Sequence, residues 1–252
     1  MTPRYLPLIA ILLAASAHAF DLGELKKELG TLNQSQSTAP AANPAALGNL
    51  SNQDQVGGLK QALTQGAESA VANLSKKDGF LGNDKVRIPL PGKLQKAADL
   101  MHTLGMGKYS DDLVTSMNRA AEAAVPEAKT LLVSAVKNMS VSDAKGILMG
   151  GNDAATQYFR RNTETALSEK FRPIVARSMQ KVRLADKYDQ FAGQGAKLGL
   201  VDPQDANLDD YITRKAMDGL FVMMAEEEKA IRANPLQAAG SLAKKVFSAI
   251  RP

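Results

Sequence analysis

Three polar clusters in this chain contain side chains that could bind an anion or transfer a proton, and the first lies in TSMNRAAEAAVPEAK. Asn118, Arg119 and Glu122 stand among alanines, so another helix could approach closely and bury them. Arg119 and Glu122 are three residues apart, a spacing that allows an ion pair within one helix. Carboxylate catalysis leaves little trace in a sequence, so Glu122 or Glu127 could also be the acid of a hydrolase. Arg119 and Glu122 are therefore candidate ligand-binding residues.

The second cluster lies in GGNDAATQYFRRNT, residues 150–163. Glycines followed by Asn and Asp end one helix and cap the next. Such a helix start can bind an anion through its free amides, and Tyr158, Arg160 and Arg161 could contribute a hydroxyl and two cations. Both arginines lie beyond the first turn of the helix, where the free amides of that turn no longer reach. We therefore favour a structural corner, with an arginine paired to an acid on a neighbouring helix, and keep these three residues as candidates for binding a small anionic ligand.

The third cluster is MAEEEKAIRANP, residues 224–235. Its three glutamates, Glu226 to Glu228, precede Lys229 and Arg232 at spacings that suit ion pairs along one helix. Exposed pairs of this kind add little stability. We therefore expect a solvated helix face here.

Other kinds of catalytic chemistry lack the residues they need. The chain has no cysteine, and His18 lies in a segment expected to be removed, which leaves His102 as the single histidine of the mature protein. A zinc site usually needs two or more His or Cys ligands, and a Ser-His triad needs an acid that orients the imidazole. The stretch before Gly107 does not match a phosphate-binding loop, and residues 205–216 lack the glycine and final glutamate of a calcium loop. We expect no metal and no cofactor.

A series of helices must position these clusters. Apolar residues recur at steps of three and four, and glycines, prolines and capping residues separate the segments. The predicted helices are 54–76, 91–104, one capped by Ser110 that stops or kinks at Pro126, 127–137, 142–149, 153–167, 173–192, 208–232 and 235–250. With 5% aromatic residues and no Trp, the core should consist of Leu, Val, Met and Ala. The predicted fold class is all-α, a compact multi-helix bundle that forms a single domain over residues 53–252.

The N-terminal segment has the layout of an export signal. In MTPRYLPLIAILLAASAHA, Arg4 precedes an apolar run, and Ala17-His18-Ala19 fits a small-x-small cleavage site. We therefore predict a cleavable signal peptide over residues 1–19. Residues 20–52 follow as a short helix and a flexible spacer rich in Ser, Gln, Asn, Ala and Pro. Because no cysteine is available for lipid attachment, the expected product is a periplasmic or secreted protein that is not a lipoprotein.

Charge and the C-terminal segment bear on the choice of partner. The formal net charge of +5 falls to +4 when Arg4 is removed, and its signs are mixed along the chain. Such a weak electrostatic footprint argues against a nucleic-acid partner.

In SLAKKVFSAIRP, residues 241–252, an apolar stripe runs beside Lys244 and Lys245. We favour docking of this helix on the bundle and keep a weak membrane-surface contact as the alternative.

Four segments also carry a resemblance to a known family. The order of KVRIPLPGKL, MNRAAEAAVPEAK, GGNDAATQYFRR and AEEEKAIRANP behind an export signal resembles a bacterial family known as a domain of unknown function, numbered four-one-nine-seven. The resemblance covers residues 53–247 and implies an exported, mostly helical envelope protein. It carries no functional residue over to this chain.

Two functions remain open at this point. The preferred one is a non-catalytic periplasmic binding or interaction module whose partner is an envelope protein or a small anionic ligand. The alternative is a carboxylate-dependent hydrolase of envelope polymers, which requires two carboxylates about 5 to 10 Å apart in an open cleft. A binding module would expose its arginines in a pocket. Arginines and acids that are buried and paired with one another would instead belong to the scaffold.

Overall fold

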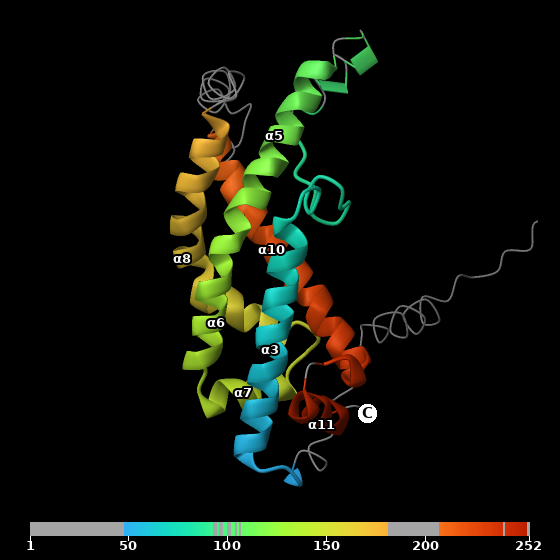
Figure 1. Cartoon of the computed structure of the whole chain (residues 1–252), viewed down its shortest axis with the longest axis vertical. Coiled ribbons are helices and arrows are strands. Elements are labelled where there is room, and N and C mark those ends of the chain that lie inside the picture. The colour runs from blue at the N-terminus through green and yellow to red at the C-terminus, as the bar shows by residue number, and fades with distance from the viewer. Residues whose placement is uncertain are drawn as a thin grey trace, which may run out of the picture. The chain divides into compact units, whose positions relative to one another are not determined.

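The computed structural model describes residues 48–92, 107–180, 207–238 and 240–250, together with single positions between 95 and 105. In this part of the chain the regular elements are α-helices and short 3-10 turns, without a strand, and they form a compact bundle (Figure 1). The all-α prediction is therefore confirmed. The predicted signal peptide, and most of the spacer that follows it, lie outside the described residues.

The helices from α5 to α8 follow one another with short connections, whereas longer stretches of chain separate α3 from α5 and α8 from α10. Their bounds are α3 (Asn52–Ser75), α5 (Lys108–Ala124), η2 (Val125–Glu127), α6 (Ala128–Asn138), α7 (Val141–Met149), α8 (Ala154–Met179), α10 (Leu208–Ala233), η4 (Pro235–Gln237) and α11 (Ser241–Ala249). The predicted interruption at Pro126 is confirmed, because the proline lies in the 3-10 turn η2 between α5 and α6. At Ser140 a capping box with Asp143 begins α7, and the hydrogen bonds from Ser140 lower the pKa of the Asp143 carboxyl.

The long helices α8 and α10 pack against each other. α5 and α6 pack on α8, while α3 packs on α10, α6 and α11 (Figure 1). Leu, Val, Met and Ala make up most of the core, as predicted, but the largest fully buried side chains belong to phenylalanine. They include Phe80, Phe159, Phe171 and Phe221.

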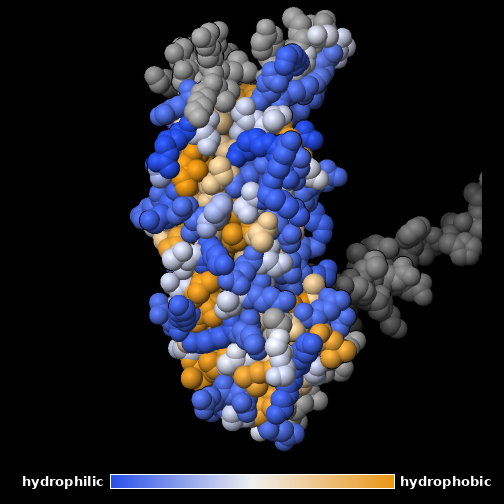
Figure 2. Space-filling model, in the orientation of Figure 1, coloured by the Kyte–Doolittle hydropathy of each residue, from blue (hydrophilic) through white to orange (hydrophobic). Residues whose placement is uncertain are grey.

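The surface of the bundle is mainly polar. Figure 2 shows hydrophilic side chains over most of one face, with hydrophobic ones in separate small patches. Large exposed apolar side chains occur singly, at Val141, Met149, Val222 and Leu236. None of the described helices is long and apolar enough to cross a bilayer.

The helix α8 corrects the predicted break between residues 167 and 173. The break was expected because proline lacks an N–H donor and its ring collides with the preceding turn, at a cost of about 3 kcal/mol. α8 instead continues through Pro173. Large side chains that are at most 1% exposed recur at every fourth position along it: Leu167, Phe171, Val175 and Met179. Burial of each is worth about 1.5 to 3 kcal/mol, so packing outweighs the proline.

Two predicted helix starts are also wrong. Gly107, not Ser110, precedes α5, and the Ser110 hydroxyl donates to the Gly107 carbonyl oxygen at 2.7 Å inside the first turn. Pro91 does not open a helix, because the chain turns at Gly92, whose φ is +46°. Positions 95, 98, 99, 102 and 103 are helical, and the other positions of the predicted helix after Gly92 lie outside the described residues.

The predicted helix 235–250 is divided in two. The 3-10 turn η4 is followed by Gly240 with a φ of +80°, and α11 begins at the next residue. The turn needs glycine for its left-handed backbone, and a Cβ atom at Gly240 would also make the end of the flexible Gln61 side chain on α3 move aside. The apolar stripe of α11, including Val246 and Phe247, is buried in the bundle and faces α3. Docking of the C-terminal helix is confirmed, and the membrane-surface contact stays a prediction.

Candidate functional site

The first polar cluster binds the chain that follows α3. Glu122 Oε1 accepts hydrogen bonds from the backbone N–H groups of Phe80 at 3.1 Å and Leu81 at 3.3 Å. Its Oε2 accepts one from Arg119 at 2.6 Å, and the other guanidinium nitrogen of Arg119 donates to Asp78 at 2.6 Å. Asp78 has a φ of +65°, which places it in the left-handed region that turns favour. The candidate residues Arg119 and Glu122 thus fix a tight turn.

One turn earlier on α5, Asn118 binds the same stretch of chain. Its side-chain oxygen accepts from the Ile88 N–H at 2.8 Å, and its side-chain nitrogen donates to the Ile88 carbonyl oxygen at 2.9 Å. Asn118 therefore replaces the neighbouring strand that an extended segment would otherwise need. From α10, the Tyr211 hydroxyl donates to the Pro89 carbonyl oxygen at 3.0 Å. We call residues 76–91 the crossing segment, because side chains of both α5 and α10 bind it.

These contacts decide what the first cluster can do. Glu122 is 4% exposed, and both of its oxygens already accept hydrogen bonds. Arg119 is about one-third exposed, and its bonds to Glu122 and Asp78 raise the pKa of the guanidinium. An acid that is buried and fully engaged has no oxygen left for a substrate, so this geometry does not fit the acid of a hydrolase. The other candidate acid, Glu127, is exposed in η2.

The second cluster does contain an anion at a helix start, and the anion is a carboxylate of the protein itself. The first free amides of α8 donate to Glu228 on α10: Ala155 N–H to Oε1 at 3.0 Å and Thr156 N–H to Oε2 at 2.9 Å. The Thr156 hydroxyl adds a third hydrogen bond at 3.0 Å. Asp153, which was expected as a possible cap, makes no side-chain cap bond. Glu228 therefore caps α8 from a different helix.

The position of Glu228 corrects the interpretation of the third cluster. Glu226 is exposed and pairs with Lys85, as expected for a solvated face, but Glu228 is only 7% exposed. Arg232 donates to Glu228 at 2.9 Å and to the Ile147 carbonyl oxygen at the end of α7 at 2.8 Å. The solvated-face prediction is therefore wrong for Glu228, which links α7, α8 and α10. A signal was present in the sequence, because Glu228 continues the apolar stripe of Phe221, Met224 and Ile231.

The remaining candidates of the second cluster separate from one another. Tyr158 is 5% exposed, and its hydroxyl donates to the Ala135 carbonyl oxygen on α6 at 2.9 Å. Arg160 donates to Glu164 at 3.1 Å and to Asp218 on α10 at 3.2 Å, and its guanidinium lies 4.5 Å from the centre of the Phe221 ring.

Arg160 thus makes the predicted pair with an acid on a neighbouring helix. Arg161 is exposed, and its charge helps to lower the pKa of Asp143. Tyr158, Arg160 and Arg161 do not converge on one cavity.

The single histidine of the expected mature chain lies beside a serine and an acid but does not form a catalytic triad. His102 Nε2 is 3.0 Å from Asp111 and 3.4 Å from the Ser110 hydroxyl oxygen. A triad needs the serine and the acid on opposite ring nitrogens, whereas here both contact the same one. Within the described part of the chain, no group of three or more His, Asp or Glu side chains could bind a metal ion.

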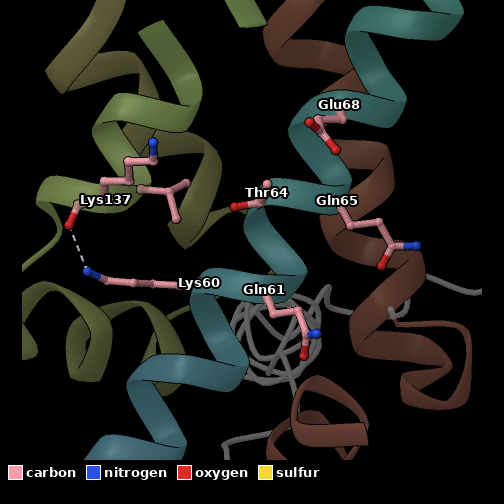
Figure 3. Close-up of a pocket in the computed structure, with 7 residues that line it drawn as sticks. Lys60, Gln61, Thr64, Gln65, Glu68 and Lys137 are labelled. Atoms are coloured by element: carbon pink, nitrogen blue, oxygen red, sulfur yellow. Dashed lines mark hydrogen bonds between the residues drawn. The ribbon is translucent and has the colours of Figure 1, made fainter. Parts of the chain in front are cut away.

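The surface contains a groove that the sequence did not lead us to single out. It lies between α3 and α6, has a volume of about 450 Å³, and is lined by Lys60, Gln61, Thr64, Gln65, Glu68, Val136 and Lys137 (Figure 3). We call it the α3–α6 groove. The α3 residues that line it are all polar and recur at steps of one, three and four, which marks one helix face. This stripe was visible in the sequence, but without α6 nothing distinguished it from an ordinary solvated face.

A second groove of about 500 Å³ lies where α3 begins, beside α7. It is lined by Gly48, Leu50, Ser51, Asn52, Gln55, Lys145, Leu148 and Met149. Its wall is partly apolar, and Met149 is half exposed. Neither groove includes a candidate residue of the three polar clusters.

These observations define the class of protein as an all-helical bundle whose buried acids bind backbone amides of other segments. The model of the family described as Protein of unknown function (DUF4197) matches residues 49–248. The chain belongs to this family, which confirms the resemblance of the four sequence segments. No curated protein and no solved structure shows a significant match to the chain.

Proposed function

We propose that this protein is a non-catalytic binding or interaction module of the bacterial envelope, exported by its signal peptide to the periplasm or beyond. The candidate residues line neither described groove, so the support for a binding role comes from the grooved surface of a scaffold that these residues stabilise. Of the candidate residues, Arg119, Glu122, Tyr158 and Arg160 bind other parts of the same chain. Side chains committed in this way stabilise a scaffold, and a scaffold with a polar grooved surface is suited to binding a partner.

The hydrolase alternative receives no support from this arrangement. Glu122 binds the crossing segment and Glu127 lies exposed on a turn, whereas a glycoside hydrolase brings two carboxylates to opposite sides of one bond. The proposal therefore predicts that Glu127→Gln leaves binding of the partner unchanged. It also predicts that Glu122→Gln acts through the stability of the fold.

The proposed role is tested by cross-linking in intact cells that express the full chain. We expect a discrete cross-linked species that is recovered with the envelope fraction and that reforms from the purified protein and its partner with fixed stoichiometry. N-terminal sequencing of the recovered protein should begin at Phe20 if the export prediction is right. Release of soluble fragments from purified envelope polymers would establish the hydrolase instead, if it is abolished by Glu127→Gln, or by Glu122→Gln at an unchanged melting temperature.

A small-molecule partner is tested separately by a thermal-shift screen of anionic compounds. A ligand present at a hundred times its dissociation constant stabilises the folded state by about 2.7 kcal/mol, which such a screen resolves easily. A compound that raises the melting temperature and competes with the cross-linked species would share its surface. A screen without hits, together with a stoichiometric cross-link, would leave a protein as the partner.

A further inference from the structure

Two lysines, Lys60 and Lys137, contribute to the lining of the α3–α6 groove. Lys60 extends across from α3, and its Nζ donates to the Lys137 carbonyl oxygen at 2.8 Å in the last turn of α6 (Figure 3). This bond uses one of the three N–H donors of the ammonium group. Lys137 is exposed, and its own side chain starts from the residue that Lys60 contacts. The Lys137 side chain points away from the Lys60 ammonium group (Figure 3), so the two positive charges lie at separate places along the groove.

The acid that lines the groove already has a counter-ion. Glu68 lies two turns along α3 from Lys60, and its carboxylate pairs with Lys129 of α6 at 3.0 Å. Counting this partner, three cations surround the groove against one anion. A binding partner must therefore supply negative charge to complement this surface.

The shape of the groove favours an extended segment over a small molecule. Only α3 and α6 supply its lining residues. Small ligands are usually enclosed over about 70 to 90% of their surface, which two walls do not provide. The face from Lys60 to Glu68 is eight residues long, or about 12 Å of helix. An extended chain covers this length with about four residues at roughly 3.3 Å each.

We propose that the α3–α6 groove is the docking site for an acidic, extended segment of a partner protein. Carboxylates of the segment pair with the ammonium groups of Lys60 and Lys137, while Thr64 and Val136 supply a hydroxyl and an apolar contact along its length. This inference rests on the proposed role as an interaction module, and it adds the surface and the chemistry of the partner.

The proposal is tested by fluorescence anisotropy with fluorescein-labelled hexaglutamate as the probe and labelled hexaglutamine as its neutral counterpart. We expect saturable binding of hexaglutamate by the full chain, weakened by added salt, and no binding of hexaglutamine. An exposed ion pair contributes a factor of up to about five, so the double variant Lys60→Gln with Lys137→Gln should bind about tenfold more weakly. The matched control is Lys145→Gln with Lys244→Gln, which removes two exposed lysines elsewhere and should bind like the unmodified protein.

The single variant Lys137→Gln guards against a folding artefact. The bond from Lys60 goes to the backbone carbonyl of residue 137, so this substitution leaves it in place. Binding should fall by a few fold at an unchanged melting temperature. A melting temperature that falls together with binding would mean that Lys137 acts on the fold, and the assignment would then fail.

Four further results would overturn the proposal. Equal weakening of hexaglutamate binding in both double variants would show a response to net charge alone. Equal binding of hexaglutamine would show that the groove does not recognise negative charge. Inorganic phosphate binding that is lost in the Lys60 and Lys137 variant, without hexaglutamate binding, would define a small-anion site. If the double variant keeps its cross-linked partner in cells, the groove assignment fails while the interaction role stands; if the unmodified protein has no partner, the role itself fails.

Discussion

At the scale of single residues, Glu228 shows how an acid in a charged run becomes part of the core. It accepts hydrogen bonds from Ala155, Thr156 and Arg232, and it lies on the buried face of α10. Loss of a partner in a buried polar group leaves the remaining donors unsatisfied, which costs more than the bond itself contributes. The same logic applies to Glu122, although its donors come from a turn.

We predict that Glu228→Gln lowers the free energy of unfolding by about 2 to 4 kcal/mol, because its NH₂ group would face the donors of Thr156 or Arg232. Urea denaturation followed by circular dichroism measures this change. The matched control is Glu226→Gln, two residues earlier on the same helix and exposed, which should unfold at nearly the same urea concentration as the unmodified protein. Equal sensitivity of the two positions would place Glu228 in solvent.

The stability that the buried Tyr158 contributes depends on pH. Burial, and in second place the charge of Asp143, raises the pKa of the Tyr158 phenol above its ordinary value of about 10. A raised folded-state pKa means that the stability due to the neutral phenol is fully present below pH about 10 and is lost as the pH rises through the folded-state pKa.

We therefore expect Tyr158→Phe to be less stable than the unmodified protein by about 1 kcal/mol at neutral pH, since the bond to the Ala135 carbonyl is lost. The difference should shrink as the pH rises above about 10, because the variant has no phenol to ionise. Unfolding curves of both proteins across this range measure it. A difference that stays constant with pH would mean that Tyr158 does not contribute to the alkaline loss of stability.

At the scale of elements, close approach of helices depends on glycine. A Cβ atom at Gly58 of α3 would lie 2.6 Å from Val246 Cγ2 and 2.7 Å from the Leu242 carbonyl oxygen of α11. The backbone atom cannot move aside without displacing the helix. Gly58 is therefore the residue that allows α11 to lie against α3.

Gly58→Ala should displace α11 and lower the melting temperature, with faster amide exchange over Ser241–Ala249 as the local sign. Gly146→Ala on α7 is the control, because a Cβ atom there meets nothing within 4 Å. In that exposed helix, alanine should stabilise the protein by about 0.5 to 1 kcal/mol. We expect the two substitutions to change the stability in opposite directions. A Gly58→Ala variant with unchanged stability would show that α11 is not docked as described.

The same scale shows what the sequence could predict. Helix periodicity and the breakers at Pro126 and residues 77–90 placed most elements, because these signals are local. Pro173 and Gly240 misled in opposite directions: a buried stripe carries α8 through the proline, while the left-handed backbone of Gly240 interrupts the helix predicted over residues 235–250. The partners that bury the α8 stripe lie on other helices, so the local sequence did not show that packing would outweigh the proline.

At the scale of the whole molecule, the polar clusters and the surface have separate roles. The sequence correctly indicated Arg119 with Glu122 and an acid partner for Arg160. It did not connect Glu228 with the start of α8, or Lys60 with α6, because these contacts join positions more than seventy residues apart. Recognition of the family adds no reaction, so the role of each residue has to come from its contacts.

The most direct test of the scaffold role is amide hydrogen exchange at Phe80, Leu81, Ala155 and Thr156. These amides bond to buried carboxylates, so we expect protection comparable to the core helices. Glu122→Gln should expose the first pair and Glu228→Gln the second, each leaving the other pair protected. Rapid exchange of all four in the unmodified protein, or protection that survives both substitutions, would contradict the central claim that these acids bind the chain together.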